Sequence, residues 1–201
     1  GVNSHNEISR FIDRKQIIPA ATFIEAEIES PGVVLQQGST AIVEMGCLDK
    51  SQEKILKDFK NKFDSEYLSF NISDDIFYTL WKKMIIVGAF GTIMTSFRMS
   101  FRELIDSKYG EKILSETMKE IKKVGIAEKI KLGTVNISEI IEELRAEADE
   151  MTSSMFNDLK NRKPLEIDSI LGYVVNLAKL KNIDLPYSQT LVSSLENFKE
   201  G

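Results

Sequence analysis

The sequence predicts a mainly α-helical protein whose first quarter carries the last strands of an α/β sheet. Two periodicities predict this class. Apolar and polar residues alternate over much of residues 20–45, which is typical of strands, whereas beyond residue 50 apolar residues recur every three or four positions, which is typical of helices. A few strands without helix cover do not form a domain. We therefore expect residues 1–50 to be the remnant of a larger domain and residues 51–201 to form a helical domain.

The strands are predicted from alternation and from turn residues. Ile and Ala alternate with Glu over residues 24–29, and Ser30-Pro31-Gly32 predicts a turn after this first strand. A second strand is predicted over residues 33–37, a turn at Gly38-Ser39, and a third strand over residues 41–45. Two flanking elements complete this region: a short helix at residues 4–13 and an edge strand at residues 67–72.

The helices are predicted from apolar stripes and end signals. Asn136 begins a plausible capping box, and Pro164 ends the helix before it. The predicted helices cover residues 55–63, 74–99, 111–124, 137–144, 151–160, 166–181 and 187–198. The most apolar run, residues 84–94, has eleven residues. Spanning a bilayer takes about 20, so we expect a buried core helix and no membrane partner.

Composition excludes several classes of function. The chain has 201 residues, a net charge of −5 and scattered Lys and Arg, which argues against a nucleic-acid partner. The single cysteine, Cys47, fits a reducing cytoplasm, and the single histidine, His5, argues against a metal cluster or a histidine-based triad. The start at Gly1 is polar rather than a signal peptide, and without an initiator Met it suggests a truncated chain.

Lys83 is the first candidate for chemistry. Leu80, Lys83, Val87 and Gly91 step by three or four, so they share one face of the predicted helix. An ammonium on an apolar face is partly desolvated, which makes it easier to deprotonate and suits a general acid. From spacing alone, a lysine that reaches out to solvent is the commoner explanation.

Glu166 and Ser154 are the other candidates. Glu166 follows Pro164 in the first turn of a helix, where backbone N–H groups stabilise an anion, although an ordinary helix-start acid explains it equally well. Ser154 and Asp158 lie four apart on one helix face. A Ser153-Ser154 pair is by itself more often a helix cap or a solvated pair.

Three motifs together resemble one family. Leu-Trp-Lys-Lys at 80–83, Ser-Ser-Met-Phe-Asn-Asp at 153–158 and Glu-Ile-Asp at 166–168 are similar in kind, order and spacing to motifs of ketopantoate reductase (2-dehydropantoate 2-reductase). The resemblance implies an all-helical domain of the 6-phosphogluconate-dehydrogenase-like type. It also implies NADP-dependent reduction of ketopantoate, a small 2-oxo acid, to pantoate in pantothenate and coenzyme A biosynthesis. In such an enzyme Lys83 would protonate the developing alkoxide, Glu166 would bind the substrate hydroxyl and Ser154 would contact the substrate.

The departures from the family pattern matter as well. No G-x-G-x-x-G motif follows a strand, so residues 1–50 resemble the end of a dinucleotide-binding domain whose cofactor-binding residues lie upstream of Gly1. We expect this chain alone to be inactive and not to bind NADP tightly. Leu165 stands in place of a threonine, and Val87 and Gly91 stand where the family often has substrate-binding asparagines.

Two alternatives therefore stay open. One is a reductase of the same fold that acts on a different 2-oxo acid, with Val87 and Gly91 bordering the substrate. The other is a non-catalytic helical module used for dimerisation. The resemblance is also compatible with a homodimer that forms through the helical domain.

Overall fold

A computed structural model describes residues 1–147 and 152–201, without the side chains of residues 25, 27, 37–40 and 147. The chain forms two compact units, Gly1–Leu80 and Trp81–Gly201. The division therefore lies thirty residues beyond the predicted boundary at residue 50, because the helix α2 and the strand β3 pack with the first unit. That residues 1–50 come from a dinucleotide-binding domain stays a prediction.

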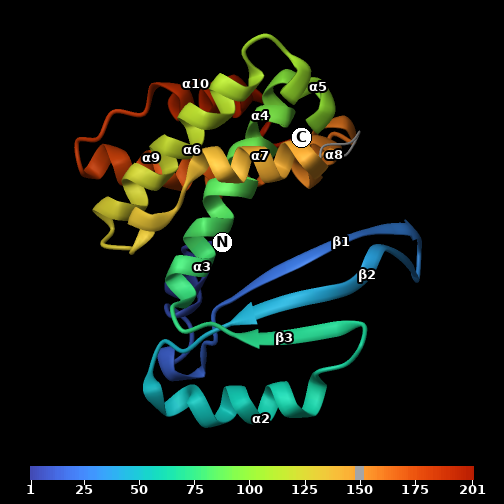
Figure 1. Cartoon of the computed structure of the whole chain (residues 1–201), viewed down its shortest axis with the longest axis vertical. Helices are drawn as coiled ribbons and strands as arrows, with labels where there is room; N and C mark the ends of the chain where they lie inside the picture. Colours follow the sequence, from blue (N-terminus) through green and yellow to red (C-terminus); the bar gives the residue numbers. More distant parts are fainter. Residues whose placement is uncertain (148–151) are drawn as a thin grey trace. The chain divides into compact units, whose positions relative to one another are not determined.

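The first unit is a small sheet with one packed helix. It contains α1 (Ser4–Ile8), β1 (Ala20–Ser30), β2 (Val33–Met45), α2 (Glu53–Phe63) and β3 (Leu68–Ile72), with 3-10 turns at Arg14–Gln16 and Lys50–Gln52. β1 and β2 form an antiparallel hairpin, and β3 pairs in parallel with the Ala41–Met45 end of β2 (Figure 1). Buried Met45, Leu56 and Phe70 join β2, α2 and β3 in one apolar cluster.

Two predictions for this unit were wrong. Residues 33–45 form one strand rather than two, and the pairing with β1 instead shifts register between Phe23 and Glu25. The helix predicted for residues 4–13 ends at Ile8. The turn at Pro31-Gly32 is confirmed, since Gly32 has φ +86°, which the second central position of a type II turn requires.

The second unit is helical, as predicted. After α3 (Ile76–Lys83), a π-helical turn spans Met84–Gly88. The remaining helices are α4 (Ala89–Phe97), α5 (Phe101–Asp106), α6 (Gly110–Ala127), α7 (Ile137–Glu147), α8 (Ser154–Lys160), α9 (Leu171–Leu180) and α10 (Pro186–Leu195), with 3-10 turns at Leu132–Thr134, Glu166–Asp168 and Glu196–Phe198. The mainly α fold class is confirmed.

The core of this unit surrounds α4, seven of whose residues are buried. α4 packs against α6, α8 and α10, and α6 adds four fully buried apolar side chains: Leu114, Met118, Ile121 and Val124. The buried carboxylate of Glu120 on α6 accepts backbone N–H bonds from Tyr187 (3.0 Å) and Ser188 (2.7 Å), and so caps the start of α10. These contacts fix α4 as the central element on which the site is built.

Three helix predictions need correction. The helix expected over residues 74–99 is interrupted by the π turn and ends at Phe97, where Arg98 takes a left-handed conformation. The helix expected over residues 166–181 divides into a 3-10 turn and α9. The helix expected from Met151 begins at Ser154, and Met151 itself lies outside the described residues.

The segment Ile76–Phe97, which comprises α3, the π turn and α4, is longer than the eleven-residue apolar run. By length and composition it passes as a membrane span, with a mean hydropathy of 1.3. However, 61% of its most apolar window is buried within the structure, and a core helix of a folded domain passes the same test.

Candidate active site

Lys83 ends α3 and directly precedes the π turn. Its neighbours Trp81, Met84 and Ile85 are buried, whereas Lys82 is exposed and Lys83 is half-buried. Burial lowers the pKa of Lys83 below its usual value of 10.5, because loss of hydration destabilises the charged ammonium more than the neutral amine. The sequence prediction of a partly desolvated lysine agrees with this environment, and such a group is well suited to give up a proton.

Val87 and Gly91 follow Lys83 but differ in their surroundings. Val87 lies in the π turn and is 39% exposed. Gly91 is buried in α4, and a Cβ atom built on it would lie 3.6 Å from Cβ of Ser153. Gly91 is therefore a packing position for the start of α8. Whether either residue borders a substrate stays a prediction.

The start of α8 is held against α4 by Ser153. The Ser153 hydroxyl accepts the Phe156 N–H (3.1 Å), donates to the carbonyl oxygen of Gly91 (3.2 Å) and lies 3.3 Å from the hydroxyl of Thr95. Ser154, the first residue of α8, is exposed. Of the predicted serine pair, one hydroxyl thus caps the helix and the other faces outward, beside the helix that carries Gly91.

Glu166 begins the 3-10 turn that precedes α9, and it is exposed. Its backbone carbonyl accepts the N–H groups of Ser169 and Ile170, both at 3.1 Å. A Cβ atom at Gly88 would lie 3.5 Å from Cγ2 of Ile170, so the Glu166 turn is adjacent to the π turn that follows Lys83. Two packing contacts thus link this helical segment to the other candidate elements: Gly88 to Ile170, just beyond the Glu166 turn, and Gly91 to Ser153, at the start of α8. That the side chains of Lys83, Ser154 and Glu166 meet at one site stays a prediction.

Asp168 has a structural contact of its own. Its carboxylate forms an ion pair with Lys199 at 2.9 Å, which ties the Glu166 turn to the C-terminal segment. This agrees with the interpretation of Asp168 as a structural residue.

The sequence did not predict a role for Thr95, nor the contact that Ser153 makes with α4. Thr95 is fully buried and donates to the Gly91 carbonyl at 2.7 Å. The signal for Ser153 was the helix-capping preference of a Ser-Ser pair. Its partner Gly91 lies 62 residues away in sequence, and no local pattern reveals such a contact.

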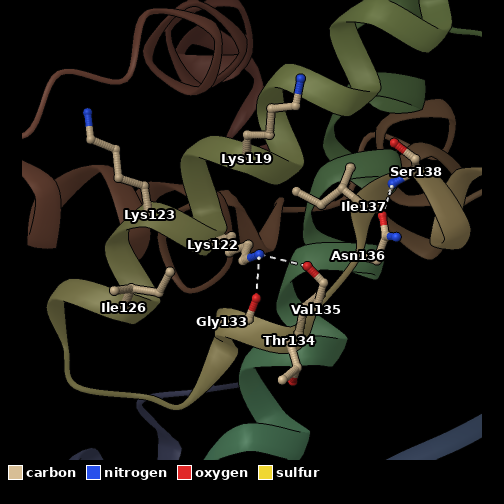
Figure 2. Close-up of a pocket in the computed structure, with 10 residues that line it drawn as sticks. All are labelled: Lys119, Lys122, Lys123, Ile126, Gly133, Thr134, Val135, Asn136, Ile137 and Ser138. Atoms are coloured by element: carbon tan, nitrogen blue, oxygen red, sulfur yellow. Dashed lines mark hydrogen bonds between the residues drawn. The ribbon is translucent and has the colours of Figure 1, made fainter.

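A separate hollow of about 660 Å³ lies between α6 and the segment that leads into α7 (Figure 2). Its lining includes three lysines, but Lys122 donates to the carbonyls of Gly133 (3.3 Å) and Val135 (2.7 Å), and Lys119 pairs with Glu116. The hollow shares no residue with the Lys83 set. Two of its three lysines are therefore bonded to the protein's own acceptors. Within the described ranges no group of three or more His, Cys, Asp or Glu residues could hold a metal ion.

Comparison with known proteins decides the family. Residues 75–199 match the model of the ketopantoate reductase PanE/ApbA C-terminal family. The chain belongs to this family. The match covers all three motifs and every candidate residue from Lys83 to Glu166.

Relatives in this family are similar over most or all of the chain. The 2-dehydropantoate 2-reductase of Streptococcus pyogenes serotype M1 is 24% identical over 201 residues, which is 100% of this chain and 65% of the relative. The 2-dehydropantoate 2-reductase of Pyrococcus horikoshii is 27% identical over 161 residues, 80% of this chain and 53% of the relative. The chain thus spans less than two thirds of the length of these curated relatives.

Solved structures give the same fold. A D-mandelate dehydrogenase with NADH and anilino(oxo)acetate is 25% identical, with a TM-score of 0.87 over 98% of this chain and 64% of that one. The PanE/ApbA family ketopantoate reductase of Ralstonia eutropha has a TM-score of 0.87 at 20% identity, over 99% of this chain and 64% of that one, and supports the fold alone.

Proposed function

We propose that this chain is the C-terminal, substrate-binding part of an NADPH-dependent 2-oxo acid reductase, and that ketopantoate is the substrate. The observation that carries the proposal is Lys83. It is a half-buried lysine with a lowered pKa, and it lies within the residues that match the family model. The helical segment that follows it contacts Ile170 through Gly88 and Ser153 through Gly91. The names of the relatives support the reaction class.

The proposed chemistry assigns one task to each residue. The Lys83 ammonium would give its proton to the carbonyl oxygen of the 2-oxo acid, and the neutral amine would then be reprotonated from water. Bound NADPH would supply the hydride to the carbonyl carbon. Glu166 accepts a hydrogen bond from the substrate hydroxyl. The exposed hydroxyl of Ser154 donates to the substrate. The product is a 2-hydroxy acid.

The cofactor would be held elsewhere. Dinucleotide phosphates bind at a Gly-rich turn before a helix, and this sequence has no G-x-G-x-x-G motif. The residues present therefore do not form a binding site for the phosphates of the cofactor, and none of the roles given above to Lys83, Glu166 and Ser154 requires such a site in this chain. We propose that NADPH is bound by residues upstream of Gly1 and that the protein is cytoplasmic. We also propose a homodimer that forms through the helical domain. A dimeric ketopantoate reductase of Staphylococcus aureus, which has the same fold, supports dimer formation.

A second candidate substrate is a 2-oxo acid with a bulkier apolar tail. Val87 offers an apolar, partly exposed side chain where the family often has an asparagine amide. The similarity to a D-mandelate dehydrogenase favours the same idea. Each neutral hydrogen bond contributes about 0.5–1.5 kcal/mol, so one missing amide would lower kcat/KM for ketopantoate by about two- to tenfold.

The deciding experiment measures kcat/KM of the full-length protein with NADPH for ketopantoate and for phenylglyoxylate. Val87→Asn is compared with the wild type, because an asparagine at Gly91 would compete with Ser153 for space. Preference for ketopantoate supports the main proposal. If the wild type prefers phenylglyoxylate and Val87→Asn reverses that preference, the result supports the second candidate substrate. Turnover of neither acid would leave the dimerisation module as the better explanation.

A further inference from the structure

The contact between α8 and α4 has a polar centre. Ser153 is 9% exposed and Thr95 is fully buried, and both hydroxyls donate to the carbonyl oxygen of Gly91, at 3.2 and 2.7 Å. Buried polar groups are costly unless they are hydrogen-bonded, so this geometry is strongly specified. A Cβ atom built on Gly91 would lie 3.6 Å from Cβ of Ser153, an ordinary van der Waals distance, so the two elements are in close contact here.

Ser153 joins two elements with a single side chain. Its hydroxyl accepts the Phe156 N–H within α8 and donates to Gly91 in α4. The first bond fixes where α8 begins, and the second fixes where that beginning lies along α4. Ser154 is the next residue and points outward from this fixed point.

We infer that Ser153 is a positioning residue for substrate binding: through Gly91 and Thr95 it holds Ser154 at the distance from the Lys83 helix that the substrate requires. This inference rests on the proposed function, because it assumes that Ser154 contacts a 2-oxo acid. It gives Ser153 a role beyond that of a helix cap.

The test is a double-mutant cycle in the full-length protein, with KM and kcat for the better 2-oxo acid as readouts. Ser153→Ala and Ser154→Ala are each expected to raise KM by about tenfold with kcat within about twofold, which is the size of effect that one lost hydrogen bond produces. The double variant is expected to be no worse than Ser154→Ala within about twofold, because Ser153 acts through Ser154. Multiplicative effects, or an unchanged KM in Ser153→Ala, overturn the inference.

Two further variants separate positioning from helix capping. Ser153→Gly keeps much of the capping preference but removes the hydroxyl, and should raise KM as Ser153→Ala does. Ser100→Ala is the matched control, because Ser100 is also buried and caps α5 by accepting the Glu103 N–H at 3.2 Å. It should lower the melting temperature comparably and leave KM unchanged. A rise in KM for Ser100→Ala equal to that for Ser153→Ala contradicts a specific role.

A measurement without turnover keeps this inference separate from the proposed function. In Ser153→Ala, amide hydrogen exchange is expected to become faster in residues 154–157 and in the α4 segment around Gly91, but not in Ser100→Ala. Unchanged protection there overturns the positioning role. Suppose that the wild type reduces no 2-oxo acid but that exchange is faster in Ser153→Ala as expected. This result would refute the proposed function and still support the role of Ser153 in holding α8 against α4.

Discussion

Replacing Lys83 by methionine tests the proposed general acid directly. Methionine is about as long as lysine and suits a half-buried position, but it has no proton to give. Loss of a positioned general acid typically lowers the rate by about 10²–10⁴-fold. At about 1.36 kcal/mol for each tenfold change, this corresponds to about 2.7–5.4 kcal/mol of transition-state stabilisation. We expect this loss in kcat, with KM changing little.

The pH profile and the stability of the same variant give independent checks. Since burial lowers the pKa of Lys83, the wild-type kcat/KM for reduction should fall on the alkaline side at a pH below 10.5. The cost of burying the ammonium is fully present below the folded-state pKa and disappears as pH rises through the unfolded-state pKa. Lys83→Met should therefore melt at the same temperature as the wild type or higher near pH 7, and this advantage should shrink towards pH 10.5.

Lys82→Met is the matched control. Lys82 is exposed and lies about 100° around the helix from Lys83, so its loss should change kcat by less than about twofold. The assay is steady-state NADPH oxidation by the full-length protein across the pH range, beside thermal melts. If Lys82→Met loses activity and Lys83→Met retains it, or if Lys83→Met keeps the wild-type alkaline limb and kcat, Lys83 is not the acid.

Three other outcomes follow from the structure. Glu166→Gln should lower kcat/KM for the 2-oxo acid by at least about tenfold. The melting temperature should change little, because Glu166 is exposed at a turn, and equal losses of stability and activity would mark the residue as structural. Glu120→Ala should lower the free energy of unfolding by about 2–4 kcal/mol in denaturant titrations, because two backbone N–H groups of α10 lose a charged acceptor; a neutral effect would contradict its capping role. This chain alone should show no micromolar NADPH binding by fluorescence titration, because it lacks the Gly-rich turn, and saturable binding would disprove the location proposed for the cofactor.

The sequence predicted the helical fold well because its apolar stripes are long and regular. The stripe of Ile55, Leu56, Phe59 and Phe63, for example, became α2, whose Leu56 is fully buried. The strand region was harder to predict. Gly38-Ser39 suggested a turn, but glycine inside a strand also accompanies a bulge, and the register of β1 with β2 shifts between the pairs Phe23–Ile42 and Glu25–Gln37.

The candidate site was predictable only in part. The half-buried state of Lys83 followed from an apolar helix face, which is local information. The bond from Ser153 to Gly91 joins residues 62 positions apart, so it depends on how α8 packs on α4. The π turn also has no side-chain signature, and the steps of three and four that relate Lys83 to Gly91 assume a regular α-helix.

That π turn at Met84–Gly88 has a consequence for how the family tolerates insertions and deletions. A π turn arises when one extra residue is accommodated within an α-helix. The wider turn takes up the extra residue locally, so the helices before and after it keep nearly the relative rotation of a regular helix that is one residue shorter. Deleting one residue from Met84–Gly88 would therefore restore a regular helix with Lys83 and Gly91 still on nearly the same face. If the same residues instead formed a regular helix of unchanged length, Lys83 would be rotated by about 100° relative to α4. Alignments of this segment should therefore place a one-residue gap inside the π turn.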